Sequence, residues 1–556
     1  SNVLMFLAGP FAGTRVPCSG RTSVVTKSPL TGIWAESDVG GKFGDYIKTS
    51  GYDGILIKGK SPNPVYLHIN QEGLQVRDAL HLWGEDTYHT HSMIEKEEPS
   101  KVSTMTIGPA GEKQVLLSSI VSDGRDARMA ARCGVGAVMG SKNLKGVAIE
   151  KGNVKTPVFD EENLKESVKQ AVALIVSRTE DMRLYGTASG VEGCYLLEDF
   201  PIKNWMQRKW DNIEALTGEH LANTLLTGRY ACAKCPIRCG RKVQVKAGKY
   251  ATPVEAGGPE YETMGSLGGS LMIDNLEAIV RANDLCNRYG MDTISVGQVL
   301  GFAFEAYEKG YLTEADTGCH PFEWGNAAAM VETVRAIGEK EGIGEILGQG
   351  LRRACRKITA SSSHPEGDPN LNIQVKGLEF PSHDPRAFSS IALGYATSPR
   401  GACHLQAYSH GLEAWLSAPE LGFNEVQDRF SPWRKPELTA KMQNLMSMFD
   451  SLKLCKFLFF GGLNISSIKD WLNYVTGWGG DIRDLLETGE RIFTLKVLFN
   501  QKEGVSGKHN SLPIRFLKGT IGENFGGMLQ DYYHFRGWST DGVPSKKTLE
   551  RLHILR

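Results

Sequence analysis

Residues 229–242 read RYACAKCPIRCGRK and contain three cysteines in a C-x2-C-x3-C run. Cys232, Cys235 and Cys239 are close enough in sequence to share one centre, because thiolates bind either zinc or iron–sulfur clusters. Either centre normally has four protein ligands. The run therefore predicts a metal site that lacks one ligand.

The fourth ligand has to come from a remote segment. The residues that follow, QVKAGKYATPVEAGG (244–258), contain neither the second Cys pair nor the His that a zinc site usually has nearby. Cys455, in FDSLKLCKFLF (449–459), follows an expected helix and has aromatic neighbours that can exclude water. We predict a [4Fe–4S] cluster held by Cys232, Cys235, Cys239 and Cys455, with structural zinc as the alternative.

Positive charges surround the cysteine run, namely Arg229, Lys234, Arg238, Arg241 and Lys242. Cations near a cluster raise its reduction potential, and they also prepare a surface for an acidic electron carrier. A solvated basic loop explains the same residues equally well. Both interpretations stay open from the sequence.

The composition is that of a globular protein with several domains. The chain has 556 residues, which is too long for one hydrophobic core. Its 63 basic and 63 acidic residues cancel, which argues against nucleic acid as the main partner. No apolar run is long enough for a membrane span. The eleven scattered cysteines suit a reducing cytoplasm better than a disulfide scaffold.

Secondary-structure patterns divide the chain into three parts and predict an α+β fold. Short β-rich runs such as GILIKGK and QVLLSSIVSDG fill residues 1–155, which we expect to form a β-rich domain. Apolar positions then repeat at helical spacing, which predicts two mostly α-helical domains at 156–366 and 367–556. The polar stretch ASSSHPEGDPN (360–370) is the predicted linker. The chain opens directly on a strand-like run, so we expect its natural beginning to lie upstream.

Two acidic residues and a histidine are candidates for acid–base chemistry. Glu260 and Glu262 lie in GGPEYETMGS, just after the cysteines, and His404 lies in SPRGACHLQAYSHG. A carboxylate buried near an anionic cofactor has a raised pKa and can exchange protons near neutral pH. Each residue alone is more often structural than catalytic.

Seven segments together resemble one known family. They are LAGPFAGTRVPCSGRTSVVTKSPLTG, GGKFGDYIKTSGYDGILIKGK, GVGAVMGSKNLKGVAI, CAKCPIRCG, GGPEYET, LCNRYGMDTIS and ATSPRGACHL. With the C-terminal DYYHFRGWSTDGVPSKKTLERL, they occur in the order seen in tungsten-dependent aldehyde:ferredoxin oxidoreductases. The resemblance extends over residues 5–553, almost the whole chain.

The resemblance implies a two-sheet, β-rich base domain that carries the cofactor, with two helical domains over it. The cofactor would be tungsten, or molybdenum in some cases, held by two pyranopterins whose phosphates are bridged by Mg²⁺. A [4Fe–4S] cluster would lie nearby, and an anaerobic, cytoplasmic enzyme would oxidise an aldehyde with water and reduce ferredoxin. The family is usually dimeric, so a homodimer or a larger complex with an iron–sulfur subunit is expected.

The resemblance also assigns site residues. The cluster ligands would be the four cysteines named above. Glu260, less favoured Glu262, and His404 would approach the metal. The residues of the cofactor-binding motifs would be Arg21, Asp38, Gly40, Gly41, Arg132, Asn287, Gly290, Asp292, Asp450 and Leu454.

The chain departs from the family pattern at several positions. Lys453 replaces the usual Gly of the second pterin motif, Asn287 replaces the Asp of the first, and Gln406 replaces a basic residue. The helix before LCNRYG has no His, so we expect no metal ion at a dimer interface. Cys133, Cys319 and Cys403 are additional thiols in cofactor-facing segments.

Two other functions stay possible from the sequence. One is the tungsten subunit of an aryl-CoA reductase, which the PEYET and RGACHL segments disfavour. The other is an electron-transfer subunit that keeps the cluster and has lost the pterin, which Lys453 and Gln406 favour.

Overall fold

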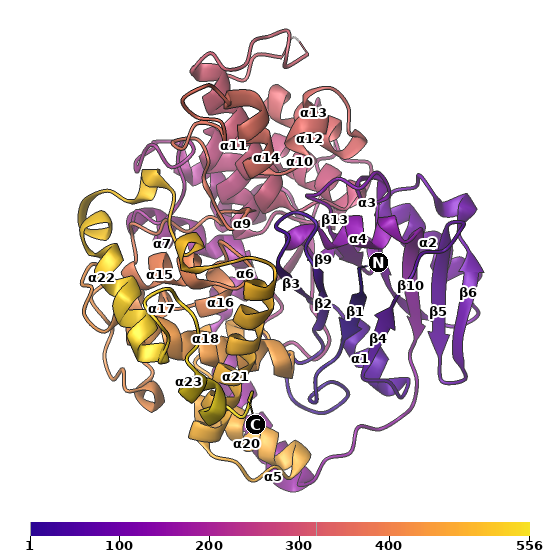
Figure 1. The fold of residues 1–556 in the computed structure, drawn as a ribbon. Coiled ribbons are helices and arrows are strands. Elements are labelled where there is room, and N and C mark those ends of the chain that lie inside the picture. Colours follow the sequence, from indigo (N-terminus) through magenta and orange to yellow (C-terminus); the bar gives the residue numbers. More distant parts are fainter. Residues whose placement is uncertain (1, 319, 556) are drawn as a thin grey trace.

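The computed structural model describes residues 2–318 and 320–555, and its N-terminal part is built on two sheets (Figure 1). The first sheet is antiparallel, with the strand order β3-β2-β1-β4. Its members are β1 (Leu4–Leu7), β2 (Thr22–Lys27), β3 (Trp34–Val39) and β4 (Gly54–Ile57).

The second sheet has six strands in the order β6-β5-β10-β7-β8-β9. Only the β10–β5 pair is parallel, and the other pairs are antiparallel. Its members are β5 (Val65–Asn70), β6 (Gly73–Asp78), β7 (Val102–Thr106), β8 (Ile120–Ser122), β9 (Arg128–Ala130) and β10 (Leu144–Glu150).

One apolar core joins the two sheets. It takes Phe6 from the first sheet and Met105 and Val147 from the second, all fully buried. Burial of such side chains is the main favourable term in folding. The same part of the chain holds four helices, α1 (Phe43–Thr49), α2 (Thr87–Glu97), α3 (Pro109–Glu112) and α4 (Val135–Ser141).

Helices dominate the middle of the chain. The helix α10 (Leu276–Tyr289) begins where the side chain of Asn275 accepts the N–H of Ala278 at 2.9 Å, and it ends at Gly290 with φ +70°. The other helices of the middle region are α5 (Glu161–Arg178), α6 (Glu180–Tyr185), α7 (Val191–Leu196), α8 (Gly218–Thr224), α9 (Tyr261–Thr263), α11 (Thr293–Glu308), α12 (Ala327–Glu339), α13 (Ile343–Leu347) and α14 (Leu351–Thr359).

The C-terminal part surrounds one buried helix, α18 (Lys435–Leu452). Two short strands precede it, β14 (Gln374–Val375) and β15 (Leu378–Glu379). The remaining helices are α15 (Ser389–Thr397), α16 (His404–Ala407), α17 (Gly411–Ala414), α19 (Phe457–Phe460), α20 (Ile465–Thr476), α21 (Ile482–Lys502), α22 (Gly519–Arg536) and α23 (Lys546–Arg551).

The helix α5 lies far in space from the helices that follow it in the middle of the chain. Figure 1 shows it beside α20, at the opposite end of the molecule from α12 and α13. Its buried residues Leu164 and Ile175 belong to the same core as Trp471 of α20 and Phe449 of α18. A helix of the first helical region therefore packs into the core of the second.

The predicted α+β class, with a two-sheet base and helices after it, is confirmed. The domain boundaries after 155 and 366 remain predictions. The stretch IGEILGQGLRRACRKI (343–358) forms two helices, α13 and α14, because Gly350 between them has φ +85°.

The close approach of α21 to α18 predicts a stability effect. A Cβ on Gly489 of α21 would lie 2.0 Å from the backbone oxygen of Asn444 in α18. We expect Gly489→Ala to lower the free energy of unfolding by about 1–3 kcal/mol, because the helices must separate. Thermal denaturation measures the change. The control is Gly526→Ala, at an exposed, open position of α22, which should stabilise the protein by about 0.4–1 kcal/mol. Equal effects of both variants would contradict the packing argument.

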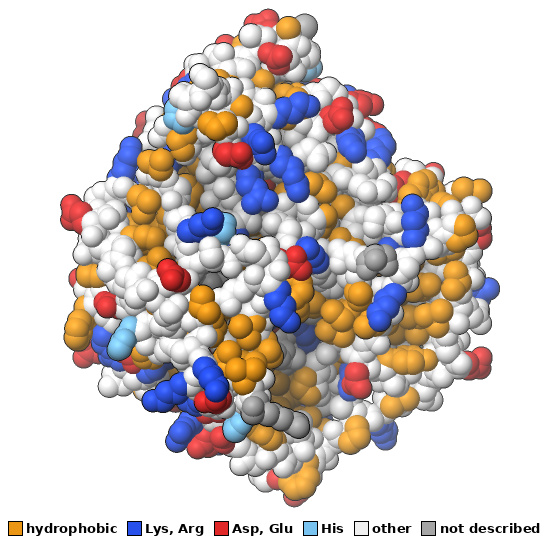
Figure 2. Space-filling model, in the orientation of Figure 1, with side chains coloured by type: hydrophobic (Ala, Val, Ile, Leu, Met, Phe, Trp, Pro, Cys, Tyr) orange, Lys and Arg blue, Asp and Glu red, His pale blue; other side chains and the backbone are white. Residues whose placement is uncertain are grey.

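The surface of the base domain carries exposed apolar side chains. Leu56, Leu74 and Val76 are all more than half exposed. Figure 2 shows a broad hydrophobic area over this part of the molecule.

Among the described residues, no helix combines the length and apolar character needed to cross a membrane.

Candidate functional site

The four predicted cluster cysteines come together from two distant segments. Cys232, Cys235 and Cys239 lie in the loop between β11 (Leu226–Tyr230) and β12 (Gly240–Val243), whose small sheet is completed by β13 (Ala256–Gly257). Cys455 follows the C-terminal turn of α18. Burial raises the pKa of Cys455 most, and the nearby thiols of Cys235 and Cys232 raise it further. Such an electrostatic effect requires the thiols to lie close together.

The spacing of these thiols disfavours a single zinc ion. Four thiolates at the usual Zn–S bond length lie about 3.8 Å from one another around a tetrahedral ion. Within the described residues, three groups of ligating atoms lie within 4.8 Å of one another, and none of them contains these cysteines. An iron–sulfur cube holds its thiolates further apart, so the loop fits a [4Fe–4S] cluster better.

A fifth thiol, which the sequence did not single out, lies at the same place. The thiol of Cys18 donates a hydrogen bond to the sulfur of Cys235 at 3.5 Å, and this bond lowers the pKa of Cys235 to about 6. The backbone N–H of Cys18 donates to Lys234 (3.2 Å), and its carbonyl accepts the N–H of Cys455 (3.1 Å). Cys18 thus ties the base domain to both cysteine segments.

We expect Cys18 to support the cluster without binding it. Cys18→Ser keeps a hydrogen-bond donor, so the variant should retain the iron content and the visible absorption of the protein. Cys235→Ser should lose both, because it removes a predicted cluster ligand. Iron analysis of the two purified variants measures this. Iron loss in Cys18→Ser with iron retained in Cys235→Ser would make Cys18 the ligand.

Glu262 and His404 face each other in the interior. Glu262 lies on α9, which continues into a π-helical turn at Met264–Gly268, a feature frequent at functional sites. Its Oε1 lies 3.5 Å from Nε2 of His404, and its Oε2 accepts the backbone N–H of Ser382 at 2.7 Å. The structure therefore brings together two of the three predicted catalytic residues.

A second histidine supports this pair. Nδ1 of His383 lies 2.5 Å from Asp199, and its Nε2 lies 3.9 Å from Oε1 of Glu262. The ring of Tyr261 stacks on His383, with centroids 4.9 Å apart. Asp199, His383, Glu262 and His404 thus form a continuous, largely buried chain of ionisable groups.

Burial and charge give these groups different protonation states. Burial raises the pKa of Glu262 above its ordinary value, and His383 partly offsets this effect. Burial alone would lower the pKa of His383, but Asp199 and Glu262 outweigh it and raise that pKa. For His404, burial and then the neighbouring histidines lower the pKa far below its usual range. His404 is therefore the ring whose neutral form is favoured, and His383 is the ring whose charged form is favoured.

Glu260, the preferred candidate from the sequence, points elsewhere. Its carboxylate pairs with Arg128 at 2.5 Å and accepts the hydroxyl of Thr187. Burial raises its pKa, but Arg128 and Arg241 outweigh this and hold the pKa below the ordinary value. Arg128 also reaches the sulfur of Cys239 at 3.7 Å. Glu260 is thus part of the cysteine side of the site and is less suited than Glu262 to accept protons.

The predicted cofactor residues of the base domain lie directly beside the cysteines. Arg21 donates to the backbone carbonyl of Asp38 at 3.1 Å. Gly40 leaves no room for a side chain, since a Cβ there would lie 2.7 Å from the sulfur of Cys232. Gly41 has φ +108°, which favours glycine. These residues form one wall of the candidate cofactor site. We call this site the cradle, and it also includes the three carboxylates and Leu454 described next.

Three carboxylates, two buried and one partly buried, are each paired with a lysine and form the next part of the cradle. Asp38 pairs with Lys453 at 3.1 Å, Asp450 pairs with Lys456 at 2.8 Å, and Glu36 pairs with Lys496. The carboxylate oxygens lie within 4.8 Å of one another. Leu454, also predicted here, is buried.

The unusual Lys453 connects the base domain to α18. It adopts φ +58° at the C-terminus of α18, the conformation that glycine would take there. Its ammonium group reaches Asp38 and the hydroxyl of Ser23. Gln406, another of these departures, donates to Asp450 at 3.3 Å.

The remaining predicted residues have different contacts. Arg132 reaches the segment of His404, whereas the others make structural contacts. Arg132 donates to the carbonyl of Ala402 at 2.6 Å, two residues before His404, and lies 3.7 Å from Asp292. Asp292 caps α11, and Gly290 ends α10. Asn287 donates to the carbonyl of Gly257 at 3.1 Å.

Several buried polar atoms beside the cradle have no protein partner. They are the Nε atoms of Arg128, Arg132 and Arg400, Nδ1 of His404 and Oε1 of Glu262. Buried polar groups are normally hydrogen-bonded. Unused donors at three arginines, next to glycines that allow a close approach, fit a large anionic cofactor with many acceptor atoms.

The additional thiols have ordinary environments where the structure describes them. Burial raises the pKa of Cys133 to about 12. The thiol of Cys403 accepts a hydrogen bond from Arg400 at 3.0 Å. Cys319 lies outside the described residues.

Comparison with known proteins gives the same architecture. The family model "Aldehyde ferredoxin oxidoreductase, N-terminal domain" matches residues 1–151, and the model for domains 2 and 3 matches residues 164–554. A tungsten-containing aldehyde ferredoxin oxidoreductase of Pyrococcus furiosus is 38% identical over the full chain and 90% of its own length. The WOR-like subunit of an aliphatic sulfonate oxidoreductase from the same organism is 30% identical, covering the full chain and 88% of that protein.

A solved structure has the same fold. It is the active site complex BamBC of benzoyl coenzyme A reductase in complex with 1,5-dienoyl-CoA, with a TM-score of 0.83 and 25% identity over the full chain and 89% of that chain. The class that this fold defines is therefore an oxidoreductase with a two-sheet base below helical domains. Within that class, the chain belongs to the aldehyde ferredoxin oxidoreductase family, as the resemblance predicted.

The sequence missed two residues of the catalytic group, His383 and Asp199. The available signal for His383 was PSHDPR (381–386), a polar stretch between apolar segments. Nothing in the sequence marked Asp199, because it reaches His383 only through the tertiary fold.

Proposed function

We propose that this chain oxidises aldehydes with water to carboxylic acids and passes the electrons through a [4Fe–4S] cluster to a ferredoxin-type carrier. The observation that supports the proposal most is the largely buried Glu262–His404 pair, whose His404 segment accepts a hydrogen bond from Arg132 through the carbonyl of Ala402. A buried acid–base pair next to a cofactor site is what a water-dependent oxidation requires.

We further propose which groups hold the cofactors. Cys232, Cys235, Cys239 and Cys455 would hold the cluster. The cradle would hold a bis-pyranopterin with tungsten, or alternatively molybdenum, and with Mg²⁺ at its phosphates; when bound, this group supplies the two-electron redox chemistry. The cations Arg21, Arg132, Arg400 and Lys453 would compensate its negative charge.

The residues of the buried chain have distinct roles in this proposal. Ionised Glu262 accepts the proton of the water that adds to the aldehyde carbon. Neutral His404 turns Nε2 toward Glu262 and leaves Nδ1 without a protein partner, so Nδ1 is the atom that would position the reacting water. His383, held by Asp199, keeps a positive charge beside Glu262 and stabilises its carboxylate form.

The decisive test is a steady-state assay of anaerobically purified protein with a panel of aldehydes and a viologen dye, combined with metal and pterin analysis. We expect turnover, together with iron, tungsten or molybdenum, and extractable pterin. No turnover with any aldehyde, from protein that contains metal and pterin, would overturn the proposal and favour ring reduction of an aryl-CoA. Iron without pterin would favour an electron-transfer subunit.

Aldehyde oxidation is preferred to aryl-CoA reduction for a specific reason. The full-length aldehyde relative is 38% identical, whereas the benzoyl-CoA reductase complex shares the fold at 25% identity.

The ten described cysteines all have free thiols, which supports a reducing compartment such as the cytoplasm.

The charge of His383 predicts a pH effect. Protonated His383 stabilises the carboxylate of Glu262, so removing it raises the pKa of Glu262. Activity that requires ionised Glu262 is lost as the pH falls through this pKa. In His383→Asn, the acid limb of kcat/KM against pH should therefore move to higher pH. Asp199→Asn should move it in the same direction, because His383 then loses the partner that keeps it charged. An unmoved limb, or a shift to lower pH, would contradict the role of His383.

A further inference from the structure

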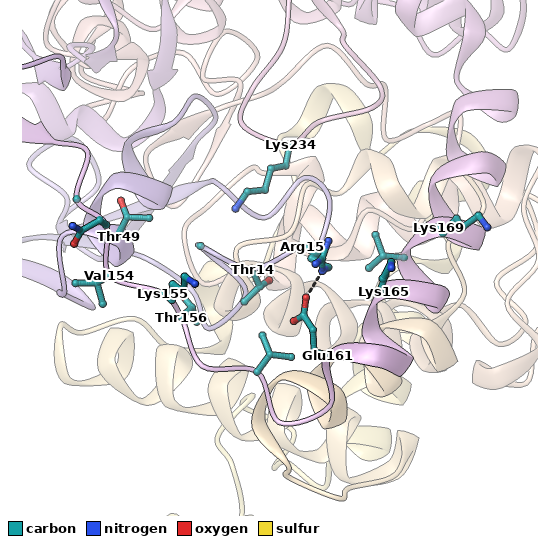
Figure 3. A pocket seen from close by; sticks show the side chains of 15 residues that line it. Thr14, Arg15, Thr49, Val154, Lys155, Thr156, Glu161, Lys165, Lys169 and Lys234 are labelled. Carbon is teal, nitrogen blue, oxygen red and sulfur yellow. Dashed lines mark hydrogen bonds and ion pairs between the residues drawn. The ribbon is translucent and has the colours of Figure 1, made fainter.

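An open, positively charged groove lies on the surface next to the cysteine loop. It has a volume of about 800 Å³. Its walls come from four segments: the loop at 13–15, the end of α1 with the segment 152–158, the exposed face of α5, and Lys234 of the cysteine loop (Figure 3). The groove thus lies between the base domain and α5.

The groove concentrates positive charge in a chain that is neutral overall. Its charged side chains are five cations and one anion, namely Arg15, Lys155, Lys165, Lys169, Lys234 and Glu161. Glu161 is neutralised by Arg15, and Lys234 pairs with Asp45 at 3.0 Å. The other three lysines have no carboxylate within ion-pair distance in the described part of the chain. Three free ammonium groups therefore face this surface.

The cysteine loop itself contributes to the groove. Lys234 lines the groove, lies between Cys232 and Cys235 in the sequence and is exposed, while both of these cysteines are partly buried. The carbonyl of Lys234 accepts the N–H of Cys18 at 3.2 Å, and the N–H of Ala233 donates to Gly41 at 2.9 Å. The loop is therefore held firmly between the groove and the cradle.

We propose that this groove is the docking site of the electron acceptor, a ferredoxin-type carrier with an acidic surface. The inference rests on the proposed function, since it assumes that electrons leave through the cysteines. Oxidation of one aldehyde with water releases two electrons and two protons, so two oxidised carriers bind in turn and each accepts one electron. The lysines attract the carrier, and Val154, Val158 and Val168 offer apolar contact within the groove.

Charge reversal in the groove tests the proposal. The variant Lys165→Glu/Lys169→Glu changes two exposed side chains of α5 that lack ion-pair partners. We expect the KM for an acidic ferredoxin to rise about tenfold at low salt, with a smaller difference at high salt. The ratio of ferredoxin-linked to viologen-linked aldehyde turnover, at subsaturating ferredoxin, should fall by the same factor.

The control makes the same change in charge elsewhere. Lys96→Glu/Lys101→Glu changes two exposed lysines at α2 and just after it, and Figure 1 shows α2 on the side of the base domain away from α5. This control should leave the ratio close to that of the unchanged protein. Equal effects of the two pairs, or no effect of the groove pair, would overturn the docking site.

Failure of docking and failure of the proposed function give different results. If the unchanged protein lacks viologen-linked aldehyde turnover, the proposed function fails. If that turnover is present but the ferredoxin KM ignores the groove charges, only the docking site fails. Direct binding of oxidised ferredoxin to both variants at low salt, without turnover, decides the case in which a variant has lost activity: only the groove pair should bind more weakly.

Discussion

Replacing Glu262 by glutamine should lower kcat for aldehyde oxidation by about 10²- to 10⁴-fold, the usual contribution of a positioned acid–base group. Glutamine keeps the shape and can accept the Ser382 N–H, but it cannot take a proton from water. Tungsten, pterin and iron contents should stay unchanged, since Glu262 touches neither the cysteines nor the cradle carboxylates. Steady-state assays with a viologen dye, together with metal analysis, measure both quantities.

Glu260→Gln is the matched control, because it makes the same chemical change two residues away. Its carboxylate pairs with Arg128 and Thr187 on the cysteine side of the site. We expect this variant to keep kcat within about tenfold of the unchanged protein, because removing its charge affects an ion pair and not the proton acceptor. An inactive Glu260→Gln together with an active Glu262→Gln would make Glu260 the catalytic carboxylate, as the sequence suggested.

Replacing Cys455 by alanine should remove the iron–sulfur cluster and abolish electron transfer to any acceptor that takes electrons through it. A cluster with three thiolate ligands has an open iron site and is readily lost during purification. The expected result is loss of cluster iron and of the broad visible absorption. Iron analysis and absorption spectra of the anaerobically purified protein provide the measurement.

The control for Cys455 is a buried cysteine outside the site. Cys286 is fully buried in α10, and burial raises its pKa, as expected for an inert thiol. Cys286→Ala should keep all cluster iron and lose only some stability. Retention of iron in Cys455→Ala would mean that Cys18 or another group completes the ligand set.

Local sequence patterns were sufficient to predict secondary-structure elements such as α10 and some residues of the candidate site. The helix α10 was predictable because its apolar positions repeat at helical spacing and Gly290 ends it. Cys455 could be chosen because three neighbouring thiols require a fourth ligand and few other cysteines had suitable surroundings. Both inferences use information that a single segment carries.

The order of Glu260 and Glu262 could not be predicted in this way. The two residues are separated by one position, and both lie in the same polar segment. Their environments differ because α9 turns Glu262 toward His404 and leaves Glu260 facing Arg128. A difference of this kind depends on side-chain direction and on partners more than a hundred positions away in the sequence.

The position of α5 shows the same limit at the level of the fold. Its apolar spacing predicts a helix, but nothing in the segment shows that it packs against α20 and forms one wall of the basic groove. Packing between distant elements depends on the complementary shapes of both faces, and each sequence segment contains only one of them.

The sequence by itself therefore determined the family, the α+β class, most helices and strands, and the four candidate cluster cysteines. These follow from local periodicity, from ligand chemistry and from the order of the motifs. Only the tertiary structure decided that Glu262 and not Glu260 faces His404, that Asp199 and His383 complete the buried chain, and that Cys18 and a basic groove adjoin the cysteines. The physical reason is that protonation, hydrogen bonding and electrostatic attraction depend on distances of a few ångströms between residues that are far apart in the chain.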